Sequence, residues 1–379
     1  MRKRKIHYIG WYIDESESNQ YSGNIPGMLK MRYVLSMLTS LDKQIIVLSL
    51  ASKSKNGFYK SKSVCRDNIT IKYIGGFNGK GKLFSIINRL IKQLLFVSYV
   101  VFSVGRRDII VLYHSVSYTK LLSRLKRVIN RYTIIEVEEV YGYSATCDRK
   151  WVQSEIAAIK QMDAFIVVND GMIRTLNLPI ERCVVSYGVG NIPERTIPRK
   201  EDGKIHVVYA GTIEARKRGA YTAAETAAFL PSNYIMHIIG FGNVDNVTRL
   251  NDIIKRINRA AGIVKVQYDG FFSGNDLDRF LFQCHIGLSS NVMRPNFANH
   301  SFPSKVITYM CHDLSVVLGY ADAFYDVPIS KGWQFYRCFE PEEIAKAITR
   351  TEVKPVGAYH EQIEQMNEDL LSFLKRYCS

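Results

Sequence analysis

The sequence predicts an α/β protein made of two doubly wound, Rossmann-like domains. Three observations lead to this prediction. The chain has 379 residues, which is too long for one ordinary hydrophobic core. Through the first 190 residues, short apolar runs alternate with helical patterns, as βα units require. A stretch rich in proline and charge follows, and the alternation then begins again at residue 205.

The first domain is expected to span residues 1–190. It opens with an apolar run of strand length at 6–13, a polar loop and a helix at 26–41. Gly23 lies in that loop, where a glycine lets the backbone approach a ligand. Further strands are expected at 44–51, 108–113, 133–140, 165–169 and 184–187, with a lysine-rich loop at 52–62.

The longest helical pattern of this domain, at 82–104, is both amphipathic and basic. Such a helix can lie in a membrane interface, or it can pack on the sheet with its arginines solvated. We expect a mixture, in which an aliphatic stripe belongs to the core and a basic rim from Lys80 to Arg107 faces lipid headgroups. The stripe comprises Leu83, Ile87, Leu90, Ile91, Leu94 and Leu95.

Polar residues follow two of the apolar strands. His114 comes directly after 108–113, and Glu138 and Glu139 lie near the end of 133–140. The carboxyl ends of parallel strands line the ligand crevice of such sheets, so these three residues are the candidate catalytic or acceptor-orienting groups. A structural role for a lone histidine remains open, and Glu136 is expected to form a buried structural pair.

The second domain is expected at 205–352, after a linker at 191–204 and before a C-terminal helix within 353–379. Its strands are expected at 205–210, 234–240, 264–268, 286–289 and 315–318, and its helices lie between them. Acidic residues at 276 and 278 favour the start of a helix, so the D-x-D spacing is not interpreted as a metal site.

The segment 299–319 carries the strongest motif. Pro303 suits the first position of a helix, and Lys305 in the first turn opposes the helix dipole unless an anion is bound there. An ordinary capped core helix remains the alternative. Ahead of this segment, glycines follow successive strands at Gly211, Gly240 and Gly242.

The pattern F-P-S-K-x-x-x-Y-M followed by L-S-V-V-L resembles the donor-binding segment of GT-B glycosyltransferases. The resemblance is greatest to the retaining family-4 enzymes of bacterial capsular and exopolysaccharide synthesis, whose segment reads P-S-K-x-x-E-Y-M-A-x-G-x-P-V-V. The family's two glutamates, eight residues apart, fall on His300 and Thr308 here. The positions that match are Pro303, Ser304, Lys305, Tyr309, Met310, Val316 and Val317.

The resemblance implies two domains that face each other across a cleft, with the donor in the second domain and the acceptor in the first. Lys217 matches the family's phosphate-binding lysine, Arg216 or Arg218 could substitute for it, and Thr212 replaces an arginine. Phe271 falls where the family holds the nucleotide base. The implied donor-binding set is Gly23, Gly211, Thr212, Lys217, Arg218, Gly240, Gly242, Phe271, His300, Ser304, Lys305 and Thr308.

The charge is distributed unevenly along the chain. The formal net charge is +16, and residues 1–200 hold 32 Lys and Arg against 15 Asp and Glu, which leaves 19 against 20 in the remainder. The basic half is expected to face an anionic membrane surface. Nucleic acid is not expected, because the basic segments lack interleaved aromatics and no DNA-binding motif occurs. No uncharged run reaches the roughly 20 residues of a membrane span.

The resemblance implies a metal-independent hexosyltransferase without a cofactor, which uses a nucleotide-diphosphate sugar, with a UDP-sugar favoured. The expected acceptor is a polysaccharide or a membrane-bound, polyprenyl-diphosphate-linked precursor of a bacterial capsule, exopolysaccharide or O-antigen. Seven cysteines without C-x-x-C spacing indicate a reducing compartment, so we expect a cytoplasmic, peripheral membrane protein. A sugar-nucleotide epimerase or hydrolase of the same fold and a catalytically silent binding partner are the alternatives.

Overall fold

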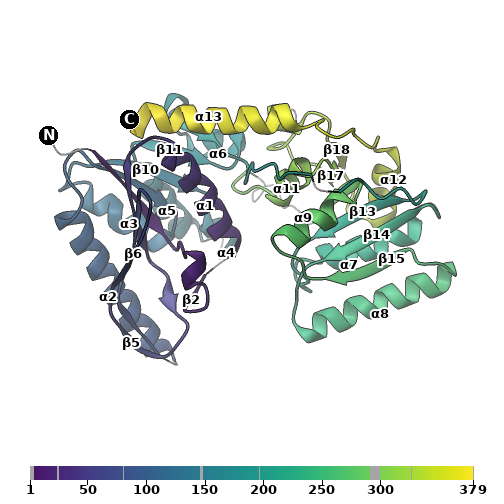
Figure 1. Ribbon diagram of the computed structural model, residues 1–379, viewed down its shortest axis with the longest axis horizontal. Coiled ribbons are helices and arrows are strands. Elements are labelled where there is room, and N and C mark those ends of the chain that lie inside the picture. Colours follow the sequence, from purple (N-terminus) through teal and green to yellow (C-terminus); the bar gives the residue numbers. More distant parts are fainter. Residues whose placement is uncertain are drawn as a thin grey trace. The chain divides into compact units, whose positions relative to one another are not determined.

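A computed structural model of the chain describes residues 4–23, 25–79, 81–145, 148–195, 197–290, 299–325 and 327–378. It contains two compact units (Figure 1). Unit 1 comprises Met1–Ser186 and Glu368–Ser379, and unit 2 comprises Tyr187–Asn367. The stretch 191–204, interpreted above as a linker, belongs to unit 2, where the Arg195 guanidinium donates a hydrogen bond to Asp313 Oδ2 at 3.0 Å.

The core of unit 1 is an eight-stranded sheet in the order β12-β11-β10-β9-β1-β3-β7-β6, in which only β6 is antiparallel to its neighbour. The central strands are near-continuous runs of Ile, Val and Leu, because helices cover both faces of a parallel sheet. The strands are β1 (Lys5–Gly10), β3 (Gln44–Ser49), β6 (Lys62–Arg66), β7 (Ile69–Tyr73), β9 (Ile109–Tyr113), β10 (Tyr132–Val137), β11 (Ala164–Val167) and β12 (Cys183–Val185).

The segment 52–78 differs from the lysine-rich loop predicted for its first part. It contains short strands that pair antiparallel, two of them with each other and a third with residues 21–22, and these strands are too short and too polar to show periodicity in the sequence. They form two small sheets, β2 (Tyr21–Ser22) with β4 (Ser52–Lys53), and β5 (Gly57–Tyr59) with β8 (Gly76–Asn78).

The helices of unit 1 connect the parallel strands, as βαβ crossovers require. They are η1 (Glu15–Glu17), α1 (Ile25–Thr39), α2 (Lys82–Phe102), α3 (Val116–Leu125), α4 (Tyr141–Ala145), α5 (Arg149–Ile159), α6 (Asp170–Leu176) and η2 (Ile180–Arg182). The second half of α13 (His360–Cys378) also belongs to unit 1, where Tyr377 stacks on Tyr132 with ring centroids 5.7 Å apart.

The orientation predicted for the long helix α2 is wrong. Its aliphatic stripe was expected in the core, yet Leu83, Leu90 and Leu94 are exposed. The residues of α2 that are buried are Lys92, Phe96, Tyr99 and Val100. An amphipathic pattern shows that a helix has an apolar face and a polar face. It does not show which of the two faces packs against the rest of the protein.

Unit 2 has a six-stranded, all-parallel sheet in the order β15-β14-β13-β16-β17-β18. Its elements are β13 (Ile205–Ala210), α7 (Gly219–Thr226), η3 (Ala227–Phe229), β14 (Tyr234–Ile239), α8 (Val244–Ala261), β15 (Val266–Gly270), α9 (Asn275–Phe282), β16 (Ile286–Ser289), α11 (Lys305–Cys311), β17 (Ser315–Gly319), η4 (Pro328–Ser330), β18 (Gln334–Tyr336) and α12 (Pro341–Arg350). The prediction of two doubly wound α/β domains is therefore confirmed.

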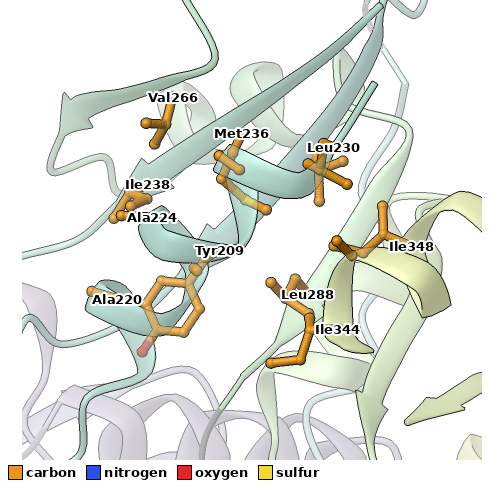
Figure 2. Close-up of a cluster of buried hydrophobic side chains, with 14 of the residues drawn as sticks. Tyr209, Ala220, Ala224, Leu230, Met236, Ile238, Val266, Leu288, Ile344 and Ile348 are labelled. Carbon is orange, nitrogen blue, oxygen red and sulfur yellow. The ribbon is translucent and has the colours of Figure 1, made fainter. Parts of the chain in front are cut away.

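One hydrophobic cluster of unit 2 lies between its sheet and the helices α7, α8 and α12. Figure 2 shows Tyr209, Met236 and Leu288 from three strands of the sheet together with Ile344 and Ile348 from α12. All five side chains are buried. This packing fixes strand β13, and with it the loop that follows the strand at Gly211.

Candidate functional site

Two glycine turns of unit 2 touch each other at the carboxyl ends of β13 and β14. A Cβ on Gly240, whose φ is +140°, would lie 1.8 Å from the carbonyl oxygen of Gly211. The Gly211 N–H donates to Ile239 O at 3.0 Å, and the Gly240 N–H donates to Gly270 O at 2.8 Å. Only glycine at 240 fits this contact, so the sequence signal of glycines after strands reflects a backbone-to-backbone approach.

A third predicted glycine extends this surface. Gly242 forms a parallel bridge with Ile213, and a Cβ on Gly242 would lie 2.5 Å from the Ile213 carbonyl oxygen. Phe241, between the two glycines, is exposed and packs edge-to-face against Phe271 with ring centroids 5.5 Å apart. The two rings provide an exposed aromatic surface beside the glycine turns, of the kind on which a planar base can stack.

Lys305 reaches this glycine surface from α11. Its Nζ lies 4.0 Å from the centroid of the Tyr209 ring, and a Cβ on Gly211 would be 3.0 Å from Nζ. Burial, with a smaller contribution from the charge of Lys217, lowers the pKa of Lys305 to about 7. In the part of the chain that the structure describes, Lys305 makes no ion pair or hydrogen bond. It is a half-buried amine that has no anionic partner among the described residues.

The start of α11 differs from the predicted helix terminus. The helix begins at Lys305 rather than Pro303, and the N–H groups of Val306 and Ile307 already donate to Pro303 O and Ser304 O, at 2.9 and 3.1 Å. These groups are not free to bind an anion. The anion-binding capacity of this segment therefore comes from the side chain of Lys305.

The other predicted donor residues of unit 2 lie around these turns or below them. Lys217 is exposed and pairs with Glu214 at 3.5 Å, and Arg218 is exposed and pairs with Glu225 at 3.3 Å, so neither cation is committed to a buried partner. Arg218 has a left-handed backbone with φ of 54°. Thr212 and Thr308 are half-buried, Ser304 is exposed, and His300 is buried.

Unit 1 carries an acid cluster at the carboxyl end of β10. Glu136 is fully buried, and its Oε2 accepts a hydrogen bond from the Tyr8 hydroxyl at 2.6 Å, whereas its Oε1 has no hydrogen-bond partner within the described residues. Burial, followed by the charge of Glu138, raises the pKa of Glu136 to about 8. Burial beside a second carboxylate therefore favours the protonated form of Glu136.

Glu138 pairs with a buried lysine that the sequence reasoning missed. Lys30 Nζ lies 3.6 Å from Glu138 Oε1 and donates to Ser186 O and Oγ at 2.6 and 2.8 Å. Lys30 is 3% exposed and lies one turn before Val34, on the apolar face of α1. A lysine within an apolar helix face was the signal that could have revealed it. Burial raises the pKa of Glu138 despite this lysine, which makes the carboxylate a stronger base.

His114 is held on both sides of its ring. Its Nδ1 lies 2.8 Å from the Thr119 hydroxyl and its Nε2 lies 2.8 Å from Glu155 Oε1. Glu155, itself fully buried, also accepts the backbone N–H groups of Tyr141 and Gly142 at 2.9 and 2.8 Å. The ring is 1% exposed, so the geometry favours a structural role over the catalytic role proposed from sequence.

His114→Ala is therefore expected to lower the stability of unit 1 by about 1–3 kcal/mol, because it leaves Glu155 with one hydrogen bond fewer in a buried position. Chemical denaturation measures this loss, and turnover per folded molecule should change little. A variant of unchanged stability whose kcat falls about 100-fold would return His114 to catalysis.

Glu139 and Gly23 are the two remaining site residues predicted in unit 1. Glu139 is half-buried and makes no hydrogen bond or ion pair within the described residues. Gly23 is exposed, and a Cβ there would lie 2.8 Å from Ile13 Cδ1 and 3.0 Å from Met28 Sδ. Gly23 therefore allows the loop to lie close to α1. The acid cluster lies in unit 1 and the glycine turns lie in unit 2.

Comparison with known proteins identifies the fold. No protein-family model and no curated protein sequence matches the chain. Solved structures do match over nearly the whole chain. A trehalose-6-phosphate structure from E. coli bound with UDP-2-fluoro glucose has a TM-score of 0.69 at 10% identity and covers 98% of this chain and 97% of that chain.

Two further solved structures match both units of the chain in the same way. HepE of Anabaena in complex with UDP has a TM-score of 0.61 at 11% identity and covers 98% of this chain and 94% of its own. A UDP-forming trehalose-phosphate synthase from Burkholderia xenovorans has a TM-score of 0.65 at 9% identity, with coverage of 99% and 96%. The similarity runs through both doubly wound units, and the chain therefore has the GT-B fold.

Proposed function

We propose that this protein is a glycosyltransferase that moves a sugar from a nucleoside-diphosphate sugar, with UDP as the favoured nucleotide, to an acceptor hydroxyl. The observation that carries the proposal is Lys305, a desolvated lysine with no anionic partner in the described structure, which lies beside the contact between Gly211 and Gly240. A diphosphate would supply the missing negative charge. The solved GT-B structures that contain UDP or a UDP-sugar analogue support the choice of nucleotide.

The proposed chemistry divides between the two units. In unit 2, Lys305 and the exposed Lys217 would neutralise the charge that develops on the leaving nucleoside diphosphate, while Phe271 and Phe241 would stack on the base. In unit 1, Glu138 would orient the acceptor hydroxyl and accept its proton. Lys30 would then be a positioning residue, because it holds Glu138 and is itself fixed by Ser186.

The proposed acceptor is a polysaccharide or a polyprenyl-diphosphate-linked precursor at the cytoplasmic face of a bacterial membrane, as in capsule or exopolysaccharide synthesis. Support comes from the basic first half of the chain, which complements anionic lipid headgroups. The proposed hexosyl transfer requires no resident metal, because the two lysines supply positive charge where the diphosphate would lie.

Replacement of Lys305 tests the donor site directly. We expect Lys305→Met to weaken UDP binding by about 10- to 150-fold, the equivalent of about 1.5–3 kcal/mol for charge-assisted hydrogen bonds. The thermal midpoint of unit 2 should hold or rise, because the variant removes an unpaired, desolvated cation. Isothermal titration calorimetry measures the affinity, and Lys255→Met on the exposed face of α8 is the matched control.

The same titration carries a second readout. Since the pKa of free Lys305 is about 7, UDP binding at about pH 8 should take up a proton, and the uptake should disappear in Lys305→Met. Buffers of different ionisation enthalpy reveal it. Equal UDP affinity in wild type and variant would refute the donor site. UDP release without any acceptor would favour a hydrolase over a transferase.

A further inference from the structure

In the first half of helix α2, the polar residues Asn88 and Lys92 face the protein while most of the apolar residues face solvent. Asn88 Oδ1 accepts the backbone N–H of Phe77 in β8 at 3.1 Å. One turn later, Lys92 Nζ donates to the carbonyl oxygens of Leu50 and Ala51, each at 2.7 Å, and is almost fully buried. The protein-facing side of this helix therefore carries two polar anchors, whereas an ordinary surface helix buries apolar residues along its whole length.

The opposite face forms an apolar stripe, defined here as the exposed residues Leu83, Phe84, Ile86, Ile87, Leu90, Leu94 and Leu95. Positions 83, 87, 90 and 94 repeat at helical spacing over three turns, and Leu94 is 71% exposed. Phe102 at the end of the helix is 84% exposed. A continuous exposed stripe of this kind marks a surface that an apolar partner covers.

The charges around the stripe are of one sign. From residue 68 to residue 107 the sequence contains no aspartate or glutamate, while Lys82, Arg89, Arg106 and Arg107 are exposed. Lys80, part of the predicted basic rim, lies outside the described residues. A second copy of the chain would bring two such acid-free, basic helices together, and their charges would repel each other. A surface with an apolar interior and anionic groups at its boundary complements this helix better than a second copy does.

Within the described residues, α2 is the one helix long and apolar enough to cross a membrane by length and composition. In this fold, however, one side of α2 packs on unit 1. Phe96, Tyr99 and Val100 are buried in unit 1, and the Tyr99 hydroxyl lies 2.6 Å from His7 Nδ1 of β1. One side of the helix is fixed to the sheet, so lipid could reach only the stripe. In Figure 1, α2 lies at an edge of unit 1, with β5 near one of its ends.

We propose that α2 lies in the plane of an anionic lipid bilayer, with the apolar stripe among the acyl chains nearest the headgroups and the flanking lysine and arginines at the phosphates. Interfacial helices with a basic polar rim bind membranes in this manner. This inference depends on α2 alone and would hold even if the proposed sugar transfer were wrong. It adds an apolar contact to the electrostatic attachment that the basic first half of the chain predicts.

Vesicle co-sedimentation of the full chain separates the two modes of attachment. We expect binding to phosphatidylglycerol-containing vesicles that decreases with salt but persists at about 1 M, where the Debye length is about 3 Å and exposed charges are screened. Leu90→Glu/Leu94→Glu should reduce this residual binding at least tenfold. Ile180→Glu, an equally exposed apolar residue of η2, is the matched control and should bind like wild type.

Fluorescence of Leu94→Trp identifies what covers the stripe. Its emission should shift to the blue with these vesicles and be quenched by lipids brominated near the headgroup. Complete release of the wild type at high salt would overturn the apolar contact. A dimer that Leu90→Glu/Leu94→Glu dissociates, with no vesicle effect, would assign the stripe to a second copy instead. UDP titration of the double variant should match wild type, which keeps this test separate from the donor site.

Discussion

Gly240→Ala is expected to destabilise unit 2 by about 4 kcal/mol or more, at the extreme of single substitutions. Its Cβ would lie 1.8 Å from the Gly211 carbonyl oxygen, which is backbone and cannot move without displacing the end of β13. The positive φ of 140° adds strain that alanine cannot relieve. Calorimetric unfolding measures the loss, and UDP binding should fall with it, because the same contact forms the proposed diphosphate surface.

Gly262→Ala provides the matched control. Gly262 ends α8 with φ of +67°, and no atom lies within 4 Å of the position of its Cβ. That substitution should therefore lose only about 1 kcal/mol from backbone strain. If both variants lost the same stability, the contact between Gly240 and Gly211 would not exist as described.

Glu136→Gln is expected to stabilise unit 1 by on the order of a few kcal/mol at about pH 9 and to change its stability little at about pH 4.5. The pKa of Glu136 rises from its ordinary 4.5 to about 8 in the folded protein. Between these values the native state binds more protons than the unfolded state, so wild-type stability falls as pH rises through this window. Glutamine resembles the protonated acid and does not titrate, which removes that loss.

Denaturant unfolding of both proteins across this pH range provides the measurement. Glu155→Gln is the comparison, since Glu155 is equally buried but accepts three hydrogen bonds. That variant should be less stable than wild type at every pH, because an amide cannot accept all three bonds. Parallel stability curves for wild type and Glu136→Gln would show that Glu136 is ionised when folded.

The alternation of strands and helices could be predicted because each element is encoded by the pattern of its own residues. Strands buried on both faces are uninterrupted apolar runs, so β16 was predicted with its observed bounds, Ile286–Ser289. Gly211, Gly240 and Gly242 could be recognised because each lies at or just after the end of a predicted strand. The short strands between 52 and 78 were missed because their stability comes from pairing with distant or adjacent segments and not from their own apolar pattern.

The site required information that only tertiary structure supplies. Lys30 became part of the acid cluster because α1 brings it to Ser186, which is 156 residues away in sequence. His114 was placed at a strand end correctly, but its partner Glu155 lies 41 residues later, and no local pattern links them. Lys305 was identified from a motif, whereas its Tyr209 platform depends on the packing of β13 in the core (Figure 2).

Unit 1 is assembled from two separate stretches of chain, and this has a consequence for biosynthesis. Leu370, Leu374 and Cys378 of its final segment are fully buried, and the Tyr377 hydroxyl donates to Glu181 O at 3.0 Å. A ribosome must therefore release all of unit 2 before the first unit can complete its packing. Unit 2 is formed by one continuous stretch of chain, so it can fold first even though it is translated second. Until the final segment has been synthesised, unit 1 exposes the apolar surface that this segment covers, and such surfaces are bound by chaperones.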